Sequence, residues 1–178
     1  MVIETEGKPN EPQAREATNI LLQGAKLLKK PDRKLQDFFK ACKTFAILLI
    51  VGLVLNILLF VLGDVDLDMI MCAAVWVCAA ICMIWFRGSV YRIYHDLLKR
   101  EGKVVITFDP EKIDYDAGDQ RYTIFWNKIS FFREFQEEVA ILPTEMTGVL
   151  ILINMEYKDQ IKAFLKENNL NIKYIERK

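Results

Sequence analysis

Two long stretches without a charged side chain constrain this sequence more than any other feature. Residues 44–63 form a stretch of 20 and residues 69–86 a stretch of 18, and neither contains Asp, Glu, Lys, Arg or His. Because a helix rises about 1.5 Å per residue, 20 residues cover about 30 Å, the thickness of the hydrocarbon layer of a bilayer. Buried helices of a soluble protein normally keep a polar stripe. The sequence therefore predicts a transmembrane helical hairpin over residues 44–86.

The short acidic segment between the two stretches predicts the orientation of this hairpin. It reads "GDVDLD", and its glycine and the aspartates Asp64, Asp66 and Asp68 are typical of a tight polar turn. This turn has no lysine or arginine, whereas both outer flanks carry several: Lys26, Lys29, Lys30, Arg33, Lys34, Lys40 and Lys43 before the hairpin, and Arg87, Arg92, Lys99, Arg100 and Lys103 after it. Positive flanks stay in the cytoplasm. We therefore expect a multi-pass protein of the plasma (inner) membrane with both termini cytoplasmic. A cation site or a toxin contact on the three aspartates is the alternative to a plain outer loop.

Residues 1–43 are expected to be a cytosolic N-terminal region. Residues 1–11 resemble a loose polar tail, and a helix is predicted to begin at Pro12, a favourable residue in a first turn. Residues 26–43 then mix basic with apolar and aromatic side chains. That mixture fits an amphipathic segment on the cytoplasmic leaflet, or one packed on the cytosolic part of the same chain. Cys42 is well placed for acylation in an organism that carries out that modification.

The pattern changes from helical to strand-like after the second apolar stretch. Residues 87–102 are expected to be a helical stalk that Gly102 ends, and residues 103–178 a cytosolic β-rich domain. Six short segments are rich in β-branched and aromatic residues and are separated by turn signals: "KVVITFD", "KIDYD", "QRYTIFW", "ISFFREF", "EVAILP" and "GVLILIN". An amphipathic helix follows, with Asn154 as its candidate cap. The predicted class is an α+β membrane protein.

This layout resembles the YcxB-like family of small bacterial membrane proteins. The segments that carry the resemblance are "ITFDPEKIDYD" and "YTIFWNKISFFREF", with Phe108, Ile113, Ile124, Trp126 and Ile129. The resemblance covers roughly residues 40–168. It implies two transmembrane helices followed by a cytosolic domain similar to a pleckstrin-homology (PH-like) fold. It implies no general activity and no catalytic residues, and some relatives resemble immunity partners of secreted bacterial toxins.

Small and polar residues inside the apolar stretches are candidates for helix packing. Ala74, Cys78 and Cys82 lie four residues apart and form a line along one helix face, which lets helices approach closely. Asn56 lies near the middle of the first stretch and needs a hydrogen-bond partner, either as glue between helices or along a pathway. Soft-metal binding by the two thiols is the alternative role for Cys78 and Cys82. A disulfide is not expected, because no cysteine lies in the outer loop.

Signals of enzymatic chemistry are close to absent. The only histidine is His95, and the eight glycines form no phosphate-binding loop. Five carboxylates gather around one predicted hairpin, as is usual for exposed turns: Asp109, Glu111, Asp114, Asp116 and Asp119. We therefore expect a protein that is not an enzyme and that has neither a cofactor nor a catalytic metal.

The expected function is binding at the inner face of the membrane. The partners are the lipid bilayer and a protein, with a toxin or a second copy of the chain as alternatives, and not nucleic acid. The candidate surface is an exposed strand edge or the segment "FFREF", with Phe131, Phe132 and Arg133; Trp126 is expected in the core or in a binding groove. Three further functions stay open. They are an immunity protein that neutralises a toxin, an anionic-lipid-binding module, and an oligomeric channel or transporter subunit.

Overall fold

The computed structural model describes residues 1–63, 67–118, 120–145 and 150–177. The chain divides into two compact units. One combines Met1–Leu35 with Tyr94–Lys178 and is called the αβ unit below; the other, Gln36–Ile93, is called the helical hairpin. The hairpin is therefore an insertion between two segments of one folded unit.

The helical hairpin consists of α2 (Phe38–Leu62) and the first part of α3 (Leu67–Leu98). Asp37 caps α2 by accepting hydrogen bonds from the backbone N–H groups of Phe39 (3.1 Å) and Lys40 (3.3 Å). Both helices are long and apolar enough to cross a membrane. The two predicted apolar helices are thus confirmed, and α3 continues without a break into the predicted stalk. Asp64, Asp66 and the side chain of Asp68 lie outside the described residues.

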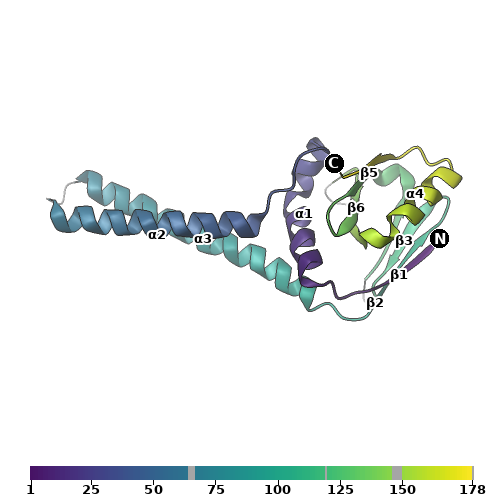
Figure 1. The fold of residues 1–178 in the computed structure, drawn as a ribbon, viewed down its shortest axis with the longest axis horizontal. Coiled ribbons are helices and arrows are strands. Elements are labelled where there is room, and N and C mark those ends of the chain that lie inside the picture. Colours follow the sequence, from purple (N-terminus) through teal and green to yellow (C-terminus); the bar gives the residue numbers. More distant parts are fainter. Residues whose placement is uncertain (64–66, 119, 146–149, 178) are drawn as a thin grey trace. The chain divides into compact units, whose positions relative to one another are not determined.

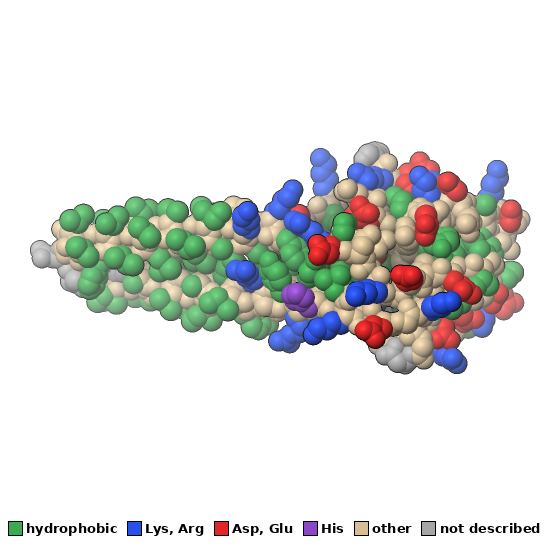
Figure 2. Space-filling view, turned by 60° about the horizontal axis from the view of Figure 1, so that its bottom comes forward, with side chains coloured by type: hydrophobic (Ala, Val, Ile, Leu, Met, Phe, Trp, Pro, Cys, Tyr) green, Lys and Arg blue, Asp and Glu red, His purple; other side chains and the backbone are tan. Residues whose placement is uncertain are grey.

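The contact between α2 and α3 is a narrow seam. On α2 the buried residues are Cys42, Leu49 and Gly52, whose spacing of seven and three is the repeat of a coiled-coil seam. Gly52 faces the ring of Trp76: a methyl group at Gly52 would lie 2.4 Å from Trp76 Cη2. Most other apolar side chains of both helices are exposed, and hydrophobic side chains cover the visible surface of the hairpin (Figure 2).

The αβ unit contains two four-stranded sheets. The first has the order β1-β2-β3-β4 and is antiparallel throughout; the second has the order β7-β6-β5-β8, in which β8 runs parallel to β5. The strands are β1 (Val2–Glu6), β2 (Lys103–Phe108), β3 (Lys112–Asp116), β4 (Arg121–Phe125), β5 (Ile129–Glu134), β6 (Glu138–Pro143), β7 (Ile151–Asn154) and β8 (Lys173–Ile175). A short 3₁₀ turn, η1 (Trp126–Lys128), joins the two sheets. All six predicted strands are present, and β1 and β8 are additional.

The first residues of the chain are a strand, so the prediction of a loose tail is wrong. Strand β1 pairs with β2 from Val2 opposite Thr107 to Glu6 opposite Lys103. Ile3 is fully buried in the core of the unit. The strand has only five residues, and a partner that lies about a hundred residues away in the sequence stabilises it. Local periodicity does not reveal such a pairing.

Helix α1 (Glu11–Lys29) packs on the second sheet. The side chains of Asn10 and Gln13 form a capping box, and Pro12 lies in the first turn as predicted. Ile20 and Leu27 are buried against strands β5 and β6 in a cluster of apolar side chains: Phe131, Phe135, Ala140 and Leu142. Leu28 and Leu35 pack against the same cluster. The part of the amphipathic segment up to Leu35 therefore belongs to the folded unit, as in the second of its two predicted roles.

The larger core lies between the two sheets and the closing helix. After the 3₁₀ turn η2 (Met155–Tyr157) comes α4 (Lys158–Glu167), whose Ile161, Phe164 and Leu165 are buried. Asn154 accepts a hydrogen bond from the backbone N–H of Glu156 (3.2 Å) and so caps η2; the N-cap of α4 itself is Tyr157, not the predicted Asn154. Figure 1 shows α4 beside the strands of this unit.

Candidate functional site

The predicted aromatic surface lies in the interior of the αβ unit. Phe131 is 2% exposed and Phe132 is fully buried, so this part of the prediction is wrong. Trp126 is buried as well and donates a hydrogen bond from Nε1 to the carbonyl oxygen of Asp109 (2.9 Å). Strand β5 is covered on both faces: Phe131 belongs to the cluster beneath α1, and Phe132 belongs to the core between the sheets. A strand covered on both faces does not alternate between apolar and polar residues, so the neighbouring Phe131 and Phe132 are both buried.

Arg133 on strand β5 forms hydrogen bonds with the segment after α1. Its guanidinium group donates hydrogen bonds to the carbonyl oxygens of Pro31 and Arg33, the latter at 2.7 Å. The same group lies 4.7 Å from the ring centroid of Phe135. This residue is half-buried, so its role in the structure is to hold two parts of the αβ unit together.

Strand β4 has an open edge. An exposed strand edge was the other binding surface that the sequence predicted. Among the described strands, β4 pairs with β3 alone, and Arg121, Tyr122, Thr123 and Phe125 are exposed. At the turn, the N–H of Ala117 donates to the carbonyl oxygen of Gln120 (2.9 Å). Residues that face each other in two antiparallel strands alternate between pairs that are joined by backbone hydrogen bonds and pairs that are not. With the register of β3 and β4, this alternation directs the backbone groups of Arg121, Thr123 and Phe125 away from the sheet.

Polar side-chain contacts within β3 and between β3 and β4 support this edge. Asp114 on β3 accepts a hydrogen bond from Thr123 Oγ1 (2.5 Å) and pairs with Lys112 Nζ (2.9 Å). The Thr123 hydroxyl and then the lysine lower the pKa of the Asp114 carboxyl. Asp116 pairs with Arg121 (2.9 Å). Of the five predicted turn carboxylates, Asp114 and Asp116 lie within β3 and are partly buried, Asp109 and Glu111 lie in the turn before it, and Asp119 lies outside the described residues.

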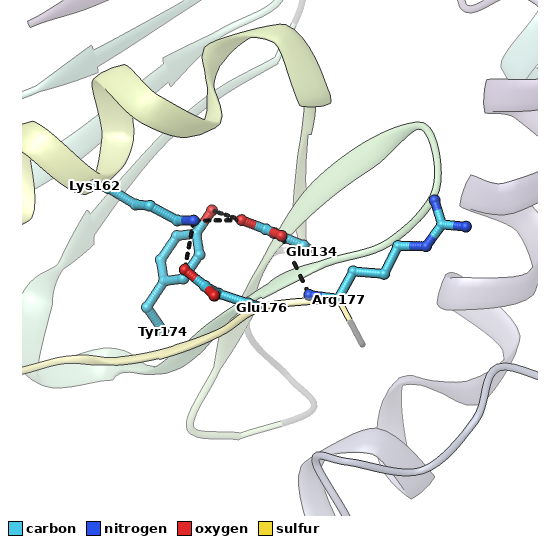
Figure 3. A network of polar contacts seen from close by, with 5 residues as sticks. All are labelled: Glu134, Lys162, Tyr174, Glu176 and Arg177. Atoms are coloured by element: carbon cyan, nitrogen blue, oxygen red, sulfur yellow. Dashed lines mark hydrogen bonds and ion pairs between the residues drawn. The ribbon is translucent and has the colours of Figure 1, made fainter.

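In the second sheet, the C-terminal strand β8 covers the edge of strand β5 that does not pair with β6. A polar network beside β8 is shown in Figure 3. The buried carboxylate of Glu134 accepts from Lys162 Nζ (2.8 Å), the Tyr174 hydroxyl (3.1 Å) and the Arg177 N–H (3.2 Å), and Lys162 also pairs with Glu176 (2.8 Å). Burial alone would raise the pKa of Glu134, but these three donors hold it below its usual value. The network therefore fixes the C-terminal segment across β5.

A broad groove of about 1090 Å³ runs beside the same segment. Its lining includes basic side chains such as Lys166 and Lys173, acidic ones such as Asp32 and Glu176, and the apolar Leu170. The charges of this lining are mixed. Sequence reasoning missed both β8 and the groove, because "KYI" is a three-residue strand within a polar tail.

Glu16 on α1 forms hydrogen bonds with the turn between β5 and β6. Its carboxylate accepts hydrogen bonds from three successive backbone N–H groups, those of Gln136 (2.7 Å), Glu137 (2.5 Å) and Glu138 (3.1 Å). Burial raises the pKa of Glu16, and the three hydrogen bonds oppose that rise. No sequence signal links Glu16 to a turn 120 residues further along the chain.

Glu138, the first residue of β6, is a buried acid with an unpartnered oxygen. It is 7% exposed, and no donor among the described residues lies within hydrogen-bond distance of its Oε2. Burial, together with the nearby charges of Glu16 and Glu137, raises the pKa of Glu138 to about 8. Glu138 lines a cavity of about 500 Å³ bordered by β1, β7, the start of α1 and η2, with Asn10, Gln13, Asn154 and Tyr157 among the lining residues.

The predicted packing residues of the hairpin lie mostly outside its seam. Asn56 Nδ2 donates to the carbonyl oxygen of Gly52 in its own helix (2.9 Å). Ala74, Cys78 and Cys82 are exposed, whereas the neighbouring face with Trp76 and Met83 is turned inward. Close packing of this stripe against another helix stays a prediction. The four cysteines are free thiols, and Cys42 and Cys82 line an apolar pocket of about 300 Å³ with Phe45 and Phe86.

The described residues contain no group of three or more His, Cys, Asp or Glu side chains that could hold a metal ion. Comparison with known proteins adds no assignment: no family model matches the chain, and no curated protein matches it.

Proposed function

We propose that this protein is a non-enzymatic integral membrane protein whose αβ unit binds a protein partner at the inner face of the plasma membrane. The α2–α3 hairpin is the membrane anchor. The αβ unit is a PH-like interaction module, and its open β4 edge is the binding surface.

The surface of the hairpin supports a membrane anchor. Ile57 on α2 and Ile84 and Trp85 on α3 are largely exposed, as are most of their apolar neighbours. Each Å² of such surface costs about 25 cal/mol in contact with water, and lipid removes that cost. By contrast, the visible face of the αβ unit carries many charged side chains, as a surface in contact with water does (Figure 2).

The way in which the hairpin is inserted supports two passes. Met1–Leu35 and Tyr94–Lys178 fold into one unit, so both ends of the inserted hairpin must emerge on the same side of a bilayer. An even number of spans satisfies this condition, and a single span does not. Together with the basic flanks, it supports cytoplasmic termini.

The arrangement of the αβ unit supports a PH-like module. Two sheets, antiparallel apart from the β5–β8 pair, are joined by η1, and helix α4 closes the core between them. Modules of this kind bind partners without catalysing a reaction, which fits the scarcity of catalytic groups along this chain.

The observation that carries the proposal is the open edge of β4. An extended segment of a partner can pair with the outward backbone groups of Arg121, Thr123 and Phe125 and so add a strand to the first sheet. Long unprotected edges favour aggregation, so proteins normally cover or charge them. Anchoring this edge near a membrane raises its effective concentration toward partners at the same surface.

Substitution at Phe125 separates strand addition from side-chain contact. The backbone φ of Phe125 is −77°, close to the value that proline requires, and its N–H points away from β3. Phe125→Pro therefore removes an outward donor without breaking the sheet, whereas Phe125→Ala removes the side chain and keeps the donor. We expect Phe125→Pro to reduce recovery of the partner at least about tenfold and Phe125→Ala to reduce it less.

The measurement is a quantitative pull-down of the full-length protein from gently solubilised native membranes. Wild type, Phe125→Pro and Phe125→Ala are compared, with circular dichroism to confirm equal folding. Equal recovery of every specific partner by wild type and Phe125→Pro would rule out strand addition at β4.

A further inference from the structure

The groove beside the C-terminal segment is large enough for part of another polypeptide. Its volume of about 1090 Å³ exceeds the usual range of small-molecule pockets, about 300–1,000 Å³. Four parts of the αβ unit form its walls: the segment after α1, the end of β5, helix α4 with the loop that follows it, and the chain from β8 onward. All of them belong to one compact unit, so the groove is a surface of that unit alone.

Apolar side chains that neither core covers completely line the groove. Leu170 and Ile172 pack against the core between the sheets, and Leu35 and Ile175 pack against the cluster beneath α1. All four are only half-buried, and all four line the groove. Both cores therefore reach the surface here, where the apolar side chains of a partner can leave water.

Each acidic side chain that lines the groove is engaged within the αβ unit. The four are Glu16, Asp32, Glu134 and Glu176. Glu16 and Glu134 accept three hydrogen bonds each. Glu176 pairs with Lys162 (2.8 Å), and Asp32 interacts electrostatically with Arg133. A segment that enters the groove therefore meets little free negative charge.

Four basic side chains of the groove have no such partner. None of them forms an ion pair with a described residue, and all are exposed: Lys34, Lys166, Lys173 and Arg177. Figure 3 shows the side chain of Arg177 directed away from the network around Glu134. Because these free charges have one sign, they attract an acidic partner and repel a basic one.

We propose that this groove binds an acidic segment of another protein. Its apolar side chains contact the half-buried lining, and its carboxylates pair with the four free basic groups. The apolar lining favours such a segment over a compact anion, which has no apolar surface to bury. The proposal goes beyond the β4 edge, because the groove does not include that strand, and it does not depend on the membrane anchor.

Selection from a library of random dodecapeptides tests the proposal. The full-length protein in detergent micelles is the bait, and empty micelles first remove peptides that bind detergent. Fluorescence anisotropy then measures the affinity of each enriched peptide. We expect the enriched peptides to combine acidic with apolar residues. Replacing their acidic residues by the corresponding amides, or their apolar residues by serine, should weaken binding at least about tenfold in each case.

Charge reversal in the groove shows where these peptides bind. Lys166→Glu and Lys173→Glu change two exposed side chains, on α4 and on β8. Each should weaken binding at least about threefold and the double variant at least about tenfold, because an ion pair is lost and a repulsion is gained. Lys128→Glu makes the same change at an exposed position outside the groove and should leave binding unchanged. Circular dichroism confirms equal folding.

Several results would overturn the proposal. They are no enriched peptide, enriched peptides without an excess of acid, and equal binding by wild type and the double variant. Equal affinity of a polyglutamate dodecapeptide, or tighter binding of tripolyphosphate, would do the same, because charge alone would then account for binding. Peptides that Phe125→Pro weakens and the double variant does not would lie at the β4 edge, so that result supports strand addition and removes only the groove.

Discussion

At the residue scale, the αβ unit contains several polar side chains whose roles depend on distant partners. Glu16 satisfies three backbone donors of a turn, Glu134 gathers three donors from the C-terminal segment, and Glu138 has an unpartnered oxygen. Three glutamates of identical chemistry therefore differ in pKa because their surroundings differ. The sequence shows each of them only as an acid among polar neighbours.

Glu138 should make the stability of the αβ unit depend on pH. Its pKa is about 8 in the folded protein and 4.5 in an exposed chain, so the unfolded state binds fewer protons between these values. Unfolding free energy should therefore fall as pH rises from about 4.5 to about 8, by up to about 1.4 kcal/mol per pH unit, and stay level above that range. Glu138→Gln cannot ionise and should lack this loss.

Thermal unfolding of both proteins in micelles, followed by circular dichroism from about pH 5 to about pH 9, measures this effect. The midpoint of Glu138→Gln minus that of wild type should grow with pH up to about 8. A difference that is constant across the range would show that Glu138 does not titrate in the folded state as described.

At the element scale, local pattern predicted the elements whose stability is mostly local. The apolar helices, the six strands and the closing helix were predicted from composition and spacing. Strands β1 and β8 were missed, because five and three residues gain their stability from partners far along the chain. Phe131 and Phe132 were misread as a surface, because a strand covered on both faces does not alternate.

The seam of the hairpin gives a prediction at this scale. Gly52→Ala would place a methyl group 2.4 Å from the Trp76 ring, so the helices must move apart. The expected cost is about 1–3 kcal/mol. Gly88→Ala on α3 is the matched control: its methyl group meets open space, and alanine favours a helix by about 0.5–1 kcal/mol.

Thermal stability of the two variants in micelles checks this prediction. Gly52→Ala should unfold at a lower temperature than wild type, and Gly88→Ala at the same or a higher temperature. Equal midpoints for Gly52→Ala and wild type would mean that Trp76 does not pack against Gly52 in the membrane protein.

At the scale of the whole molecule, the chain combines an apolar hairpin with a folded unit built from both of its flanks. The candidate sites follow this division. The β4 edge and the cavity of Glu138 belong to the αβ unit, whereas Asn56 and the stripe of Ala74, Cys78 and Cys82 belong to the hairpin. The cavity of Glu138 was not predictable, since segments separated in sequence form it, and the sequence predicted an exposed strand edge without indicating that the strand is β4.

Reporter fusions test the orientation proposed for the whole molecule. Green fluorescent protein, which does not fluoresce when exported unfolded to the periplasm, is fused to residue 1 or to residue 178, or inserted in the acidic turn. Both terminal fusions should fluoresce and the insertion should not. Loss of fluorescence from one terminal fusion alone would indicate an odd number of passes and contradict the two-pass anchor.

The insertion of the hairpin within the αβ unit also sets an order of events during synthesis. Strand β1 and helix α1 leave the ribosome first, but β2 and the strands β5 and β6 on which α1 packs are made only after both apolar helices. At about 5–20 residues per second, the roughly 100 residues between α1 and the end of β6 take about 5–20 s. During this interval Ile20 and Leu27 have no sheet to cover them. If the hairpin is the proposed membrane anchor, it has time to enter the bilayer before the unit closes, and the nascent N-terminal segment has to be kept from aggregation until β6 is complete.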